Sequence, residues 1–407
     1  MRILIFNTFY FPKFIGGAEV SVQLLAEGLV KKGNEIFVIT FGEKFEIKRV
    51  NGVVVIRVKQ RNIYSSYTAN KHRSASAKIL WHLVDSFNPL YLFFINVFLK
   101  RIKPDVIHTN NIMGFSPSLW AVIKFSKIPI VHTIRDYYLI CHRTNMFNNN
   151  HSCDGLCKDC KITHSLKSGF MQCPDYFVGI SKYILNRHNS IIGDEKPRSV
   201  VYNGVKTNHN EISIKLPYSD KLTFGYMGRI STDKGVEYMV KELAACAPQS
   251  KTKFKVMLAG RGENDFINKL NALAVGVEIE FVGVVKPEAF FRQIDVLIVP
   301  SLWPEPFGRT VIEALSFGVP VCISDSGGLT ELHDDISTWL YAPEESRLTQ
   351  LIENIVNNQQ SIELKKIHCL SSAQRFNEIK YIEGYQNIYE TIKDTSKSMS
   401  DKKRVAL

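Results

Sequence analysis

Two stretches of the chain repeat one order of elements, and this order limits the folds that the chain can adopt. Each stretch begins with a short apolar run, residues 2–8 and 222–227. A glycine-containing loop, residues with helical spacing and a second apolar run (residues 36–40 and 254–259) follow in each. A strand, loop, helix and strand in this order form a βαβ unit, whose two strands lie parallel in one sheet. The sequence therefore predicts two α/β halves, each built on a parallel sheet.

The length of the chain agrees with two halves of domain size. It has 407 residues, of which 45% are apolar and 22% are charged, as in ordinary globular proteins. We expect an N-terminal domain over residues 1–203 and a C-terminal domain over residues 204–375, joined near Pro197–Asn210. A helix over residues 376–394 could pack back on the N-terminal domain, and residues 395–407 are expected to form a frayed tail.

Positive charge is concentrated in the first half. Residues 1–200 hold 27 Lys and Arg against 13 Asp and Glu, a net charge of +14, whereas residues 201–407 carry a net charge of −2. Such an excess suggests an anionic partner: nucleic acid, a membrane surface or an anionic substrate. We expect no nucleic-acid partner, because the chain has no paired-His zinc-finger spacing, no aromatic RNA-binding signature and no basic helix.

Apolar segments are too short for export or for membrane spanning. The most apolar window, Leu90–Leu99, contains Asn96 and falls short of the ~20 residues that a spanning helix needs. We therefore expect a cytoplasmic protein at the inner face of the membrane. Its basic half would contact an anionic bilayer, with help from four aromatic side chains of the stretch Trp81–Leu99, namely Trp81, Tyr91, Phe93 and Phe94. The alternative, which we favour for this stretch, is a helix packed in the core.

The most informative motif spans residues 305–320. A strand ends near Pro300, a helix begins near Gly308, and Glu305 and Glu313 are separated by seven residues. Free backbone N–H groups at a helix start favour an anion or a hydroxyl-rich ligand, and the two carboxylates can accept hydrogen bonds from sugar hydroxyls. The alternative is a capping Glu followed by a solvated Glu.

A second motif places two cations in a glycine-containing loop. Arg229 and Lys234 are five residues apart and are flanked by Gly228 and Gly235. A guanidinium offers a fork to phosphate oxygens, an ammonium offers a point charge, and the glycines permit close approach of the backbone. The pair therefore suits a diphosphate, although two solvated surface charges are the alternative.

These motifs carry a resemblance to a known family. The Glu305/Glu313 stretch resembles the E-x7-E motif of the retaining glycosyltransferases of family 4. Further matches span nearly the whole chain: Gly16-Gly17, Asn203-Gly204-Val205, Gly225–Arg229, Asp233-Lys234-Gly235, Gly260-Arg261-Gly262 and Ser326-Gly327-Gly328. The resemblance implies the GT-B fold, an α/β architecture in which two Rossmann-like domains with parallel sheets face each other across a cleft. The N-terminal domain would bind the acceptor and the C-terminal domain the nucleotide-sugar.

The resemblance also implies a reaction. A sugar would pass from a nucleoside-diphosphate sugar to a hydroxyl of a saccharide acceptor with retained anomeric configuration, and no divalent metal would be required. Together with the basic first half, this suggests a lipid-linked acceptor in the synthesis of a cell-surface polysaccharide such as lipopolysaccharide. The alternatives are another GT-B enzyme, such as a nucleotide-sugar epimerase, or a non-catalytic protein that binds an anionic ligand.

Roles for individual residues follow from the resemblance. Arg229 and Lys234 would bind the donor diphosphate and stabilise the departing nucleotide, Glu313 the ribose hydroxyls and Glu305 the donor sugar. The remaining candidates for substrate binding share a place in the family's motifs, and they are Gly16, Gly17, Phe307, Gly308 and Arg309.

The segment Val131–Tyr138 departs from the family pattern. Family members often have a His-Asp pair here, but this chain has Arg135-Asp136, with His132 three residues earlier. Either Arg135 replaces the histidine and meets an anionic sugar or phosphate, or the register of this match is wrong. His132 is a further candidate for substrate binding. A histidine satisfied within a strand is the alternative for His132. Asp136 is a candidate catalytic residue that would contact a donor or acceptor hydroxyl.

Cysteines gather in a polar insert over residues 141–173. Five of the eight cysteines lie there, and Cys153-x3-Cys157-x2-Cys160 has spacings that suit tetrahedral zinc. Cys141 would complete the four ligands of a structural zinc site, with Cys173 or His151 as substitutes. Free or redox-active thiols are the alternative.

Overall fold

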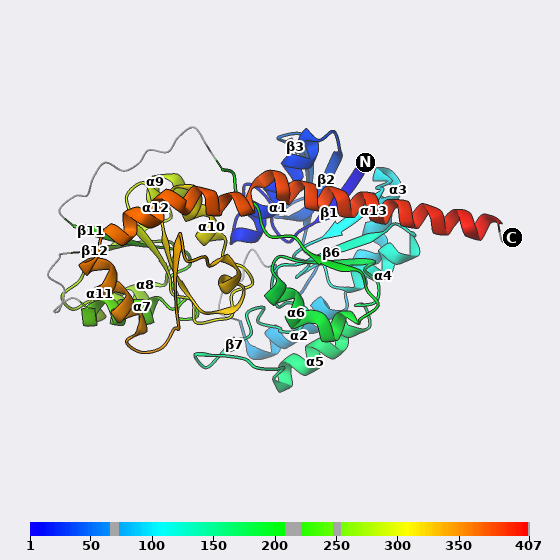
Figure 1. Ribbon diagram of the computed structural model, residues 1–407. Helices are drawn as coiled ribbons and strands as arrows, with labels where there is room; N and C mark the ends of the chain where they lie inside the picture. The colour runs from blue at the N-terminus through cyan, green and yellow to red at the C-terminus, as the bar shows by residue number, and fades with distance from the viewer. Residues whose placement is uncertain (66–72, 208–220, 247–253, 406–407) are drawn as a thin grey trace. The chain divides into compact units, whose positions relative to one another are not determined.

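The computed structural model describes residues 1–65, 73–207, 221–246 and 254–405 (Figure 1). It divides into two compact units. Unit 1 contains Met1–Asn145, Asp154–Gly204 and Glu378–Leu407, and unit 2 contains Met146–Cys153 and Val205–Asn377. Residues 208–210 of the expected junction lie outside the described residues.

Unit 1 is built on an eight-stranded sheet in the order β10-β9-β6-β5-β1-β2-β4-β3. Every pair of neighbours is parallel except β3 and β4, which form an antiparallel pair at one edge. The strands are β1 (Arg2–Phe6), β2 (Glu35–Gly42), β3 (Glu46–Val50), β4 (Val53–Lys59), β5 (Val106–Thr109), β6 (Ile130–Ile134), β9 (Tyr176–Gly179) and β10 (Arg198–Val200).

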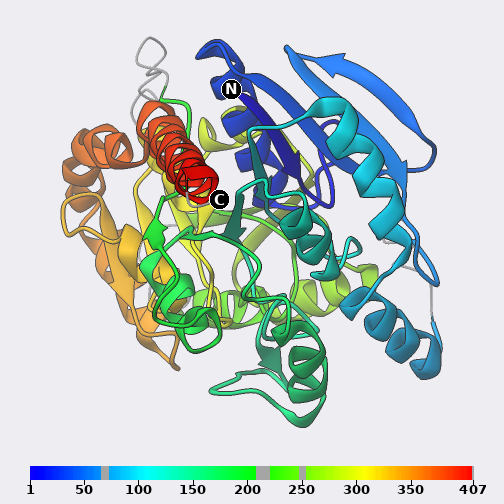
Figure 2. The same ribbon diagram turned by 90° about the vertical axis from the view of Figure 1, so that its right-hand side faces the viewer.

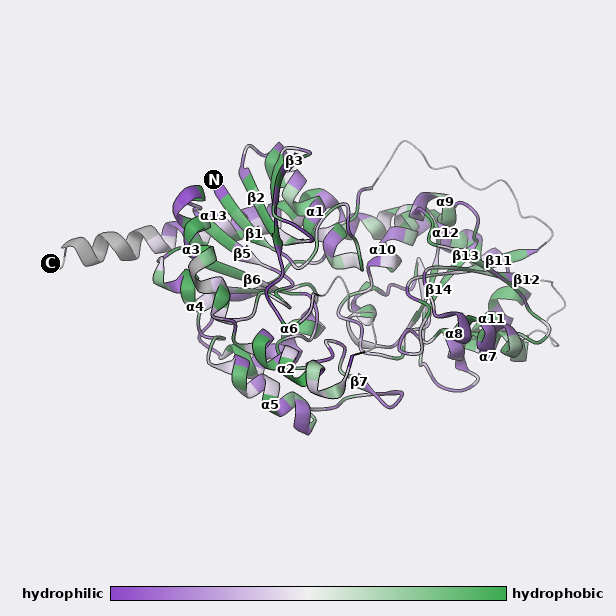
Figure 3. Cartoon of the chain, turned by 180° about the vertical axis from the view of Figure 1, so that it is seen from behind, coloured by the Kyte–Doolittle hydropathy of each residue, from purple (hydrophilic) through white to green (hydrophobic). Residues whose placement is uncertain are grey.

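Helices cover both faces of this sheet, which explains why its strands are apolar throughout. In β1, Ile3 and Ile5 join one buried cluster, whereas Leu4 and Phe6 join the cluster on the opposite face. Figure 3 shows β1, β5 and β6 in the hydrophobic colour. The helices are α1 (Gly17–Lys31), α2 (Ala75–Ser86), α3 (Leu90–Ile102), α4 (Ser118–Phe125), α5 (Lys158–Ser168), α6 (Lys182–Ile192) and α13 (Glu378–Val405).

The last helix, α13, belongs to unit 1 and packs along α1 and β5 (Figures 1 and 2). Tyr381, Tyr385 and Tyr389 recur every four residues, so they share one face of the helix, and all three are buried. α13 continues to Val405. The expectation of a frayed tail from residue 395 is therefore wrong for residues 395–405, which are helical.

Unit 2 is built on a six-stranded, fully parallel sheet in the order β13-β12-β11-β14-β15-β16. The strands are β11 (Leu222–Met227), β12 (Phe254–Ala259), β13 (Glu278–Gly283), β14 (Val296–Val299), β15 (Val321–Ser324) and β16 (Thr338–Tyr341). The helices are α7 (Val236–Cys246), α8 (Asn264–Leu273), α9 (Pro287–Phe291), α10 (Arg309–Ser316), η2 (Gly327–Leu332), α11 (Arg347–Asn357), α12 (Gln360–Ala373) and η3 (Gln374–Phe376). A short hairpin of β7 (Phe147–Asn148) and β8 (His151–Ser152) also clusters with unit 2.

The aromatic stretch Trp81–Leu99 lies mostly in the core of unit 1. Trp81 and Tyr91 are buried, and Phe94 packs against the core cluster, so the prediction of core packing is confirmed for these three side chains. The side chain of Phe93 lies outside the described residues. Within the described ranges, no helix combines the length and the apolar character needed to cross a bilayer.

Candidate active site

The candidate residues of unit 2 lie in loops that follow three neighbouring strands. Arg229 and Lys234 follow β11, Glu305 follows β14, and Gly327 follows β15. These three strands are adjacent and parallel, so their carboxyl ends lie at one edge of the sheet. Ligands of open α/β sheets bind at this edge.

Lys234 and Glu305, which are far apart in the sequence, form an ion pair. Nζ of Lys234 lies 2.5 Å from Oε1 of Glu305, and both side chains are largely buried. Ser301 donates a second hydrogen bond to the same Oε1 at 2.8 Å, and the ammonium lies 4.6 Å from the centroid of the Trp303 ring. The loop after β14 thus holds the ammonium in place before any ligand binds.

Arg229 keeps its guanidinium accessible. Its Nη2 lies 2.5 Å from Oδ2 of Asp233, yet its side chain is 62% exposed. Asp233 also accepts a hydrogen bond from Ser231 Oγ at 2.6 Å, so its carboxylate is fixed independently of Arg229. A guanidinium that is held by one carboxylate but is still open to solvent can donate further hydrogen bonds to phosphate oxygens.

Two glycines let these loops approach each other. Gly235 has φ of +71°, and a Cβ there would lie 1.7 Å from the carbonyl oxygen of Pro300. Gly327 has φ of +63°, and a Cβ there would lie 2.5 Å from the carbonyl oxygen of Glu305. Gly235 is thus required by the β11–β14 contact, and Gly327 by the contact between the loops after β14 and β15.

The helix α10 carries the second glutamate of the motif. It begins after Gly308, whose φ is +108°, and Arg309 donates from Nε to Oε1 of Glu313 at 2.7 Å. This bond fixes the orientation of the Glu313 carboxylate on the first turns of α10. Phe307 is 2% exposed and packs edge-on against Phe376, so its ring belongs to the interior of unit 2.

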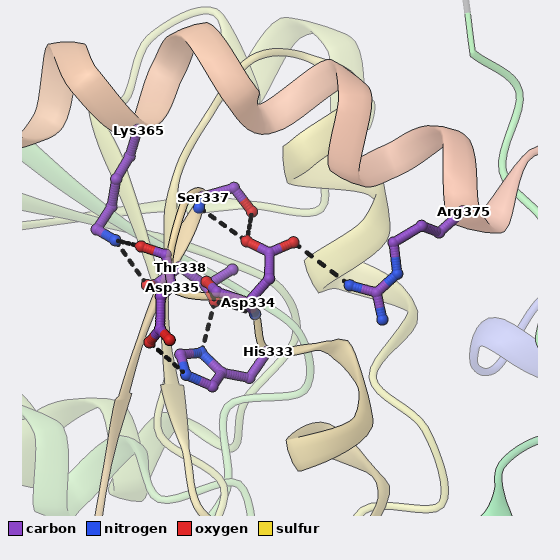
Figure 4. Close-up of polar contacts among 7 residues, drawn as sticks. All are labelled: His333, Asp334, Asp335, Ser337, Thr338, Lys365 and Arg375. Atoms are coloured by element: carbon purple, nitrogen blue, oxygen red, sulfur yellow. Dashed lines mark hydrogen bonds and ion pairs between the residues drawn. The ribbon is translucent and has the colours of Figure 1, made fainter.

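The loop after η2 is anchored by its own polar contacts. Figure 4 shows Asp334 between Ser337 and Arg375, with Lys365 on the other side of the loop. Asp334 accepts hydrogen bonds from the backbone and hydroxyl of Ser337 and lies 3.4 Å from the Arg375 guanidinium. Lys365 donates to the carbonyl oxygens of Asp335 and Thr338. These contacts tie the segment that follows Gly327 to α12 and η3.

In unit 1 the glycine pair stands at the start of α1. Gly16 and Gly17 are exposed, and Glu19 accepts a hydrogen bond from the Gly16 N–H at 2.9 Å. Gly16 has extended backbone angles, and a Cβ there would meet nothing within 4 Å. Neither backbone strain nor packing within the described residues therefore requires a glycine at Gly16.

Arg135 is a structural centre of unit 1. Its guanidinium is buried and donates to Asn110 Oδ1 at 2.8 Å, to Asn203 Oδ1 at 2.8 Å and to Tyr381 OH at 3.0 Å. These contacts link the ends of β5 and β6 to α13. Three bonds to neutral groups satisfy this buried cation, and its charge opposes the rise that burial causes in the pKa of Glu19 and of Asp136.

His132 and Asp136 flank this arginine differently. His132 is buried within β6, is hydrogen-bonded to Thr109 Oγ1 at 3.0 Å and lies against Trp120, which is the placement of a core histidine. Burial lowers its pKa to about 3, so the ring is neutral. Asp136 is partly buried, and burial raises its pKa to about 6, against the opposing effects of the Tyr138 N–H, Lys167 and Arg135.

Three of the four candidate metal ligands gather at the start of α5. Cys160 lies 3.4 Å from Nδ1 of His142 and interacts with the thiols of Cys141 and Cys157. The backbone N–H of Cys160 lowers the pKa of the Cys157 thiol. Cys153 clusters with unit 2. In the part of the chain that the structure describes, no group of three or more His, Cys, Asp or Glu side chains is arranged to hold a metal ion. Metal analysis of the purified protein is the test of the zinc prediction.

Sequence reasoning missed the residues that support these sites. Asp233 was visible as the first residue of the Asp-Lys-Gly motif, but its role as the partner of Arg229 depends on the loop conformation. Ser301 and Trp303 precede Glu305 by four and two residues, and this proximity was their only signal. Asn110 and Lys167 gave no signal, because their contacts span 25 and 29 residues.

Comparisons with known proteins define the class. A family model described as Glycosyltransferase Family 4 matches residues 15–209, and one described as Glycosyl transferases group 1 matches residues 208–370. The solved structure of Alr3699/HepE from Anabaena in complex with UDP superposes with a TM-score of 0.68 at 19% identity, over 96% of this chain and 100% of that chain. The predicted GT-B fold is thereby confirmed.

Two relatives found by sequence similarity come from a cps region and from O-antigen biosynthesis. A protein described as an uncharacterized 42.6 kDa protein in the cps region of Klebsiella pneumoniae is 35% identical over 336 residues, 82% of this chain and 87% of its own length. The O-antigen biosynthesis glycosyltransferase WclY of Escherichia coli is 26% identical over 313 residues, 72% of this chain and 80% of its own length. The chain therefore belongs to the GT-B glycosyltransferases that join a family 4 N-terminal half to a group 1 C-terminal half.

Proposed function

We propose that this glycosyltransferase moves a hexosyl group from a nucleoside-diphosphate sugar to a hydroxyl of a saccharide acceptor, with retained anomeric configuration. The observation that carries the proposal is the ammonium of Lys234, held 2.5 Å from Glu305, in the same loop as the exposed guanidinium of Arg229. Negative charge grows on the departing diphosphate during transfer, and fixed cations aimed at that charge lower the barrier.

Each residue of the site has a part in this reaction. Lys234 and Arg229 bind the diphosphate, and Glu305 both orients Lys234 and accepts hydrogen bonds from the donor sugar. Glu313 accepts from the ribose, and Arg309 fixes its orientation. Because two cations can neutralise the diphosphate, we propose that catalysis needs no divalent metal, and dialysis against EDTA should leave the transfer rate unchanged.

The acceptor is proposed to be a lipid-linked saccharide used in cell-surface polysaccharide synthesis. The cps-region relative and the O-antigen enzyme WclY support this choice, and the UDP complex of the Anabaena protein supports a nucleotide-sugar as the donor. The net charge of +14 in residues 1–200 supports peripheral binding at the anionic inner face of the membrane. Flotation with anionic liposomes should recover the protein at low salt and lose it at high salt. Failure to bind at low salt would remove the membrane part of the proposal.

A nucleotide-sugar panel tests the reaction. UDP-glucose, UDP-galactose, UDP-N-acetylglucosamine and GDP-mannose are screened for an increase in unfolding temperature, since a ligand that binds the folded state stabilises it. The donor that binds is then incubated with lipid-linked saccharides. Nucleotide release coupled to a new glycoside supports transfer, and NMR of the product gives the anomeric configuration. Release without a new glycoside would favour an epimerase, and no binding by any donor would contradict the proposal.

A further inference from the structure

A small cavity lies within unit 1 at the carboxyl ends of β5 and β6. Its volume is about 10 Å³, which is room for about one water-sized atom. The polar residues that line it include Asn110, His132, Arg135 and Asp136. The cavity is therefore too small for a sugar ring but large enough for a single hydroxyl oxygen.

Asn110 brings an unused hydrogen-bond donor to this cavity. The residue is 2% exposed, and its Oδ1 accepts from Nε of Arg135 at 2.8 Å. A guanidinium only donates, so this bond fixes the orientation of the amide. Nδ2 is buried and has no hydrogen-bond partner among the residues that the structure describes. A buried donor without a partner is costly, so this one is expected to have a ligand atom to bind.

Asp136 brings an acceptor to the same cavity. Its Oδ1 accepts from the Tyr138 N–H at 2.8 Å, which fixes the carboxyl group at the end of β6. A carboxylate has acceptor sites beyond this one bond. Lys167 supports its negative charge from α5, where Nζ donates to the Tyr138 carbonyl oxygen at 2.8 Å and lies over the Tyr138 ring.

The chemistry of the cavity selects its occupant. An anion would be attracted by Arg135 but repelled by Asp136, and it could not donate a hydrogen bond to that carboxylate. A carbonyl oxygen could use Asn110 but not the carboxylate. A hydroxyl group donates one hydrogen bond and accepts others, so it can satisfy both residues at once. A water molecule has the same complementarity and is the alternative occupant.

We propose that this cavity binds one hydroxyl group of a sugar, which accepts a hydrogen bond from Asn110 Nδ2 and donates one to the Asp136 carboxylate. The proposal rests on the proposed glycosyl transfer and makes Asn110 a specificity-determining residue of it. The hydroxyl belongs either to the donor sugar or to the acceptor, since both present the same group.

A reciprocal exchange of the two side chains tests the proposal. Asn110→Asp keeps an oxygen for Arg135 but replaces the donor with an acceptor, and Asp136→Asn replaces a carboxylate with an amide. Each single variant should lower kcat/KM for transfer at least tenfold. The double variant N110D/D136N again offers one donor and one acceptor, and should recover to within about threefold of the parent. Far-UV circular dichroism and the unfolding temperature show whether each variant is folded.

Binding of the donor and of the free nucleotide to the single variants shows whether the hydroxyl belongs to the donor or to the acceptor. If it belongs to the donor, the single variants bind the screened nucleotide-sugar at least tenfold more weakly than the parent but bind UDP or GDP equally well. If it belongs to the acceptor, both donor and nucleotide binding are unchanged, and only transfer to the saccharide falls.

Two results would overturn the subsite. In the first, the parent enzyme transfers sugar and both single variants transfer it equally well. In the second, a structure with donor and acceptor bound shows only water between Asn110 and Asp136. A parent chain that binds no nucleotide-sugar would instead contradict the proposed function itself, and the subsite with it.

Discussion

At the scale of single residues, Gly235 shows how the site of unit 2 depends on the close approach of two loops. Its missing Cβ leaves room for the carbonyl oxygen of Pro300, which would lie 1.7 Å away, and its φ of +71° favours glycine. We expect Gly235→Ala to lower the free energy of unfolding by about 3 kcal/mol or more, because backbone must move. Denaturant unfolding of the purified variant measures the loss.

Gly283 supplies the matched control. It also has a positive φ, +69°, but a Cβ there would meet nothing within 4 Å. Gly283→Ala should therefore cost only the backbone strain, about 1–2 kcal/mol. Equal losses in the two variants would mean that the Pro300 contact does not constrain the loop.

The proposed role of the Lys234–Glu305 pair can be tested by removing the ammonium of Lys234. Lys234→Ala removes the ammonium that we propose to bind the diphosphate, and we expect kcat/KM to fall by about 10²–10³-fold, comparable to losing one oxyanion donor. Lys241→Ala is the control, since Lys241 forms an exposed ion pair with Glu237 on α7. An unchanged rate in the Lys234 variant, measured by nucleotide release, would remove this residue from the mechanism.

Sequence alone selected the candidate residues of unit 2, because their motif order is specific, and the structure places their loops after neighbouring parallel strands. It did not predict their pairing. The contact of Lys234 with Glu305 spans 71 residues, and the Arg309–Glu313 bond depends on the start of α10. At Arg135 the sequence predicted a ligand contact or a register shift, whereas the structure adds three internal bonds that no local pattern encodes.

At the scale of elements, α5 brings a buried ammonium into unit 1. Lys167 is 2% exposed, and burial lowers its pKa to about 8, against the opposing effects of Asp85 and Asp136. Asp85 is fully buried and accepts a hydrogen bond from Tyr138 OH at 2.7 Å. The cysteine-rich insert that carries α5 thus supplies a countercharge for two carboxyl groups.

Removal of that ammonium should destabilise unit 1. Lys167→Met removes the ammonium that interacts with Asp85 and leaves Asp136 with Arg135 as its cation, and we expect a loss of about 3–5 kcal/mol in the free energy of unfolding. Lys161→Met, on an exposed position of the same helix, should change it by less than about 0.5 kcal/mol. Urea unfolding of both variants measures the two losses. Equal stabilities would contradict the role of Lys167 as a countercharge in unit 1.

The elements that sequence predicted best are the buried strands. Runs such as Val296–Val299 and Phe254–Ala259 are apolar throughout because helices cover both faces of each sheet. The edge strand β3 was missed, since Glu46–Val50 is mostly polar. The helix α5 was missed as well, because its polar sequence and cysteine spacing suggested a metal-bound loop.

At the scale of the whole molecule, buried histidines distinguish unit 1 from unit 2. His108, His132 and His188 are all buried, and all three belong to unit 1. Burial lowers the pKa of each, so the folded state holds them neutral. A fall in pH should therefore lower the stability of unit 1, because these histidines must be protonated.

His188 gives the sign of this effect. Its pKa is lowered by burial to about 4 from an unfolded value of 6.5. Between these pH values His188 is protonated in the unfolded chain but not in the folded chain. The folded state therefore loses stability as pH falls from 6.5. Relative to His188→Gln, the parent should lose about 1.4 kcal/mol per pH unit across this window. Chemical unfolding of both proteins from pH 7.5 to 4.5 measures the difference.

Asp136 should act in the opposite direction, which makes it the internal control. Burial raises its pKa to about 6 from 3.8, so between these values the folded state binds a proton that the unfolded chain does not. Relative to Asp136→Asn, the parent should gain about 1.4 kcal/mol per pH unit as pH falls from 6 to 4. Slopes of the same sign in the two comparisons would show that these groups are not held in the folded state as the structure places them. Opposite slopes would show that the neutral His188 and the partly buried Asp136 carboxyl oppose each other in setting the acid stability of unit 1.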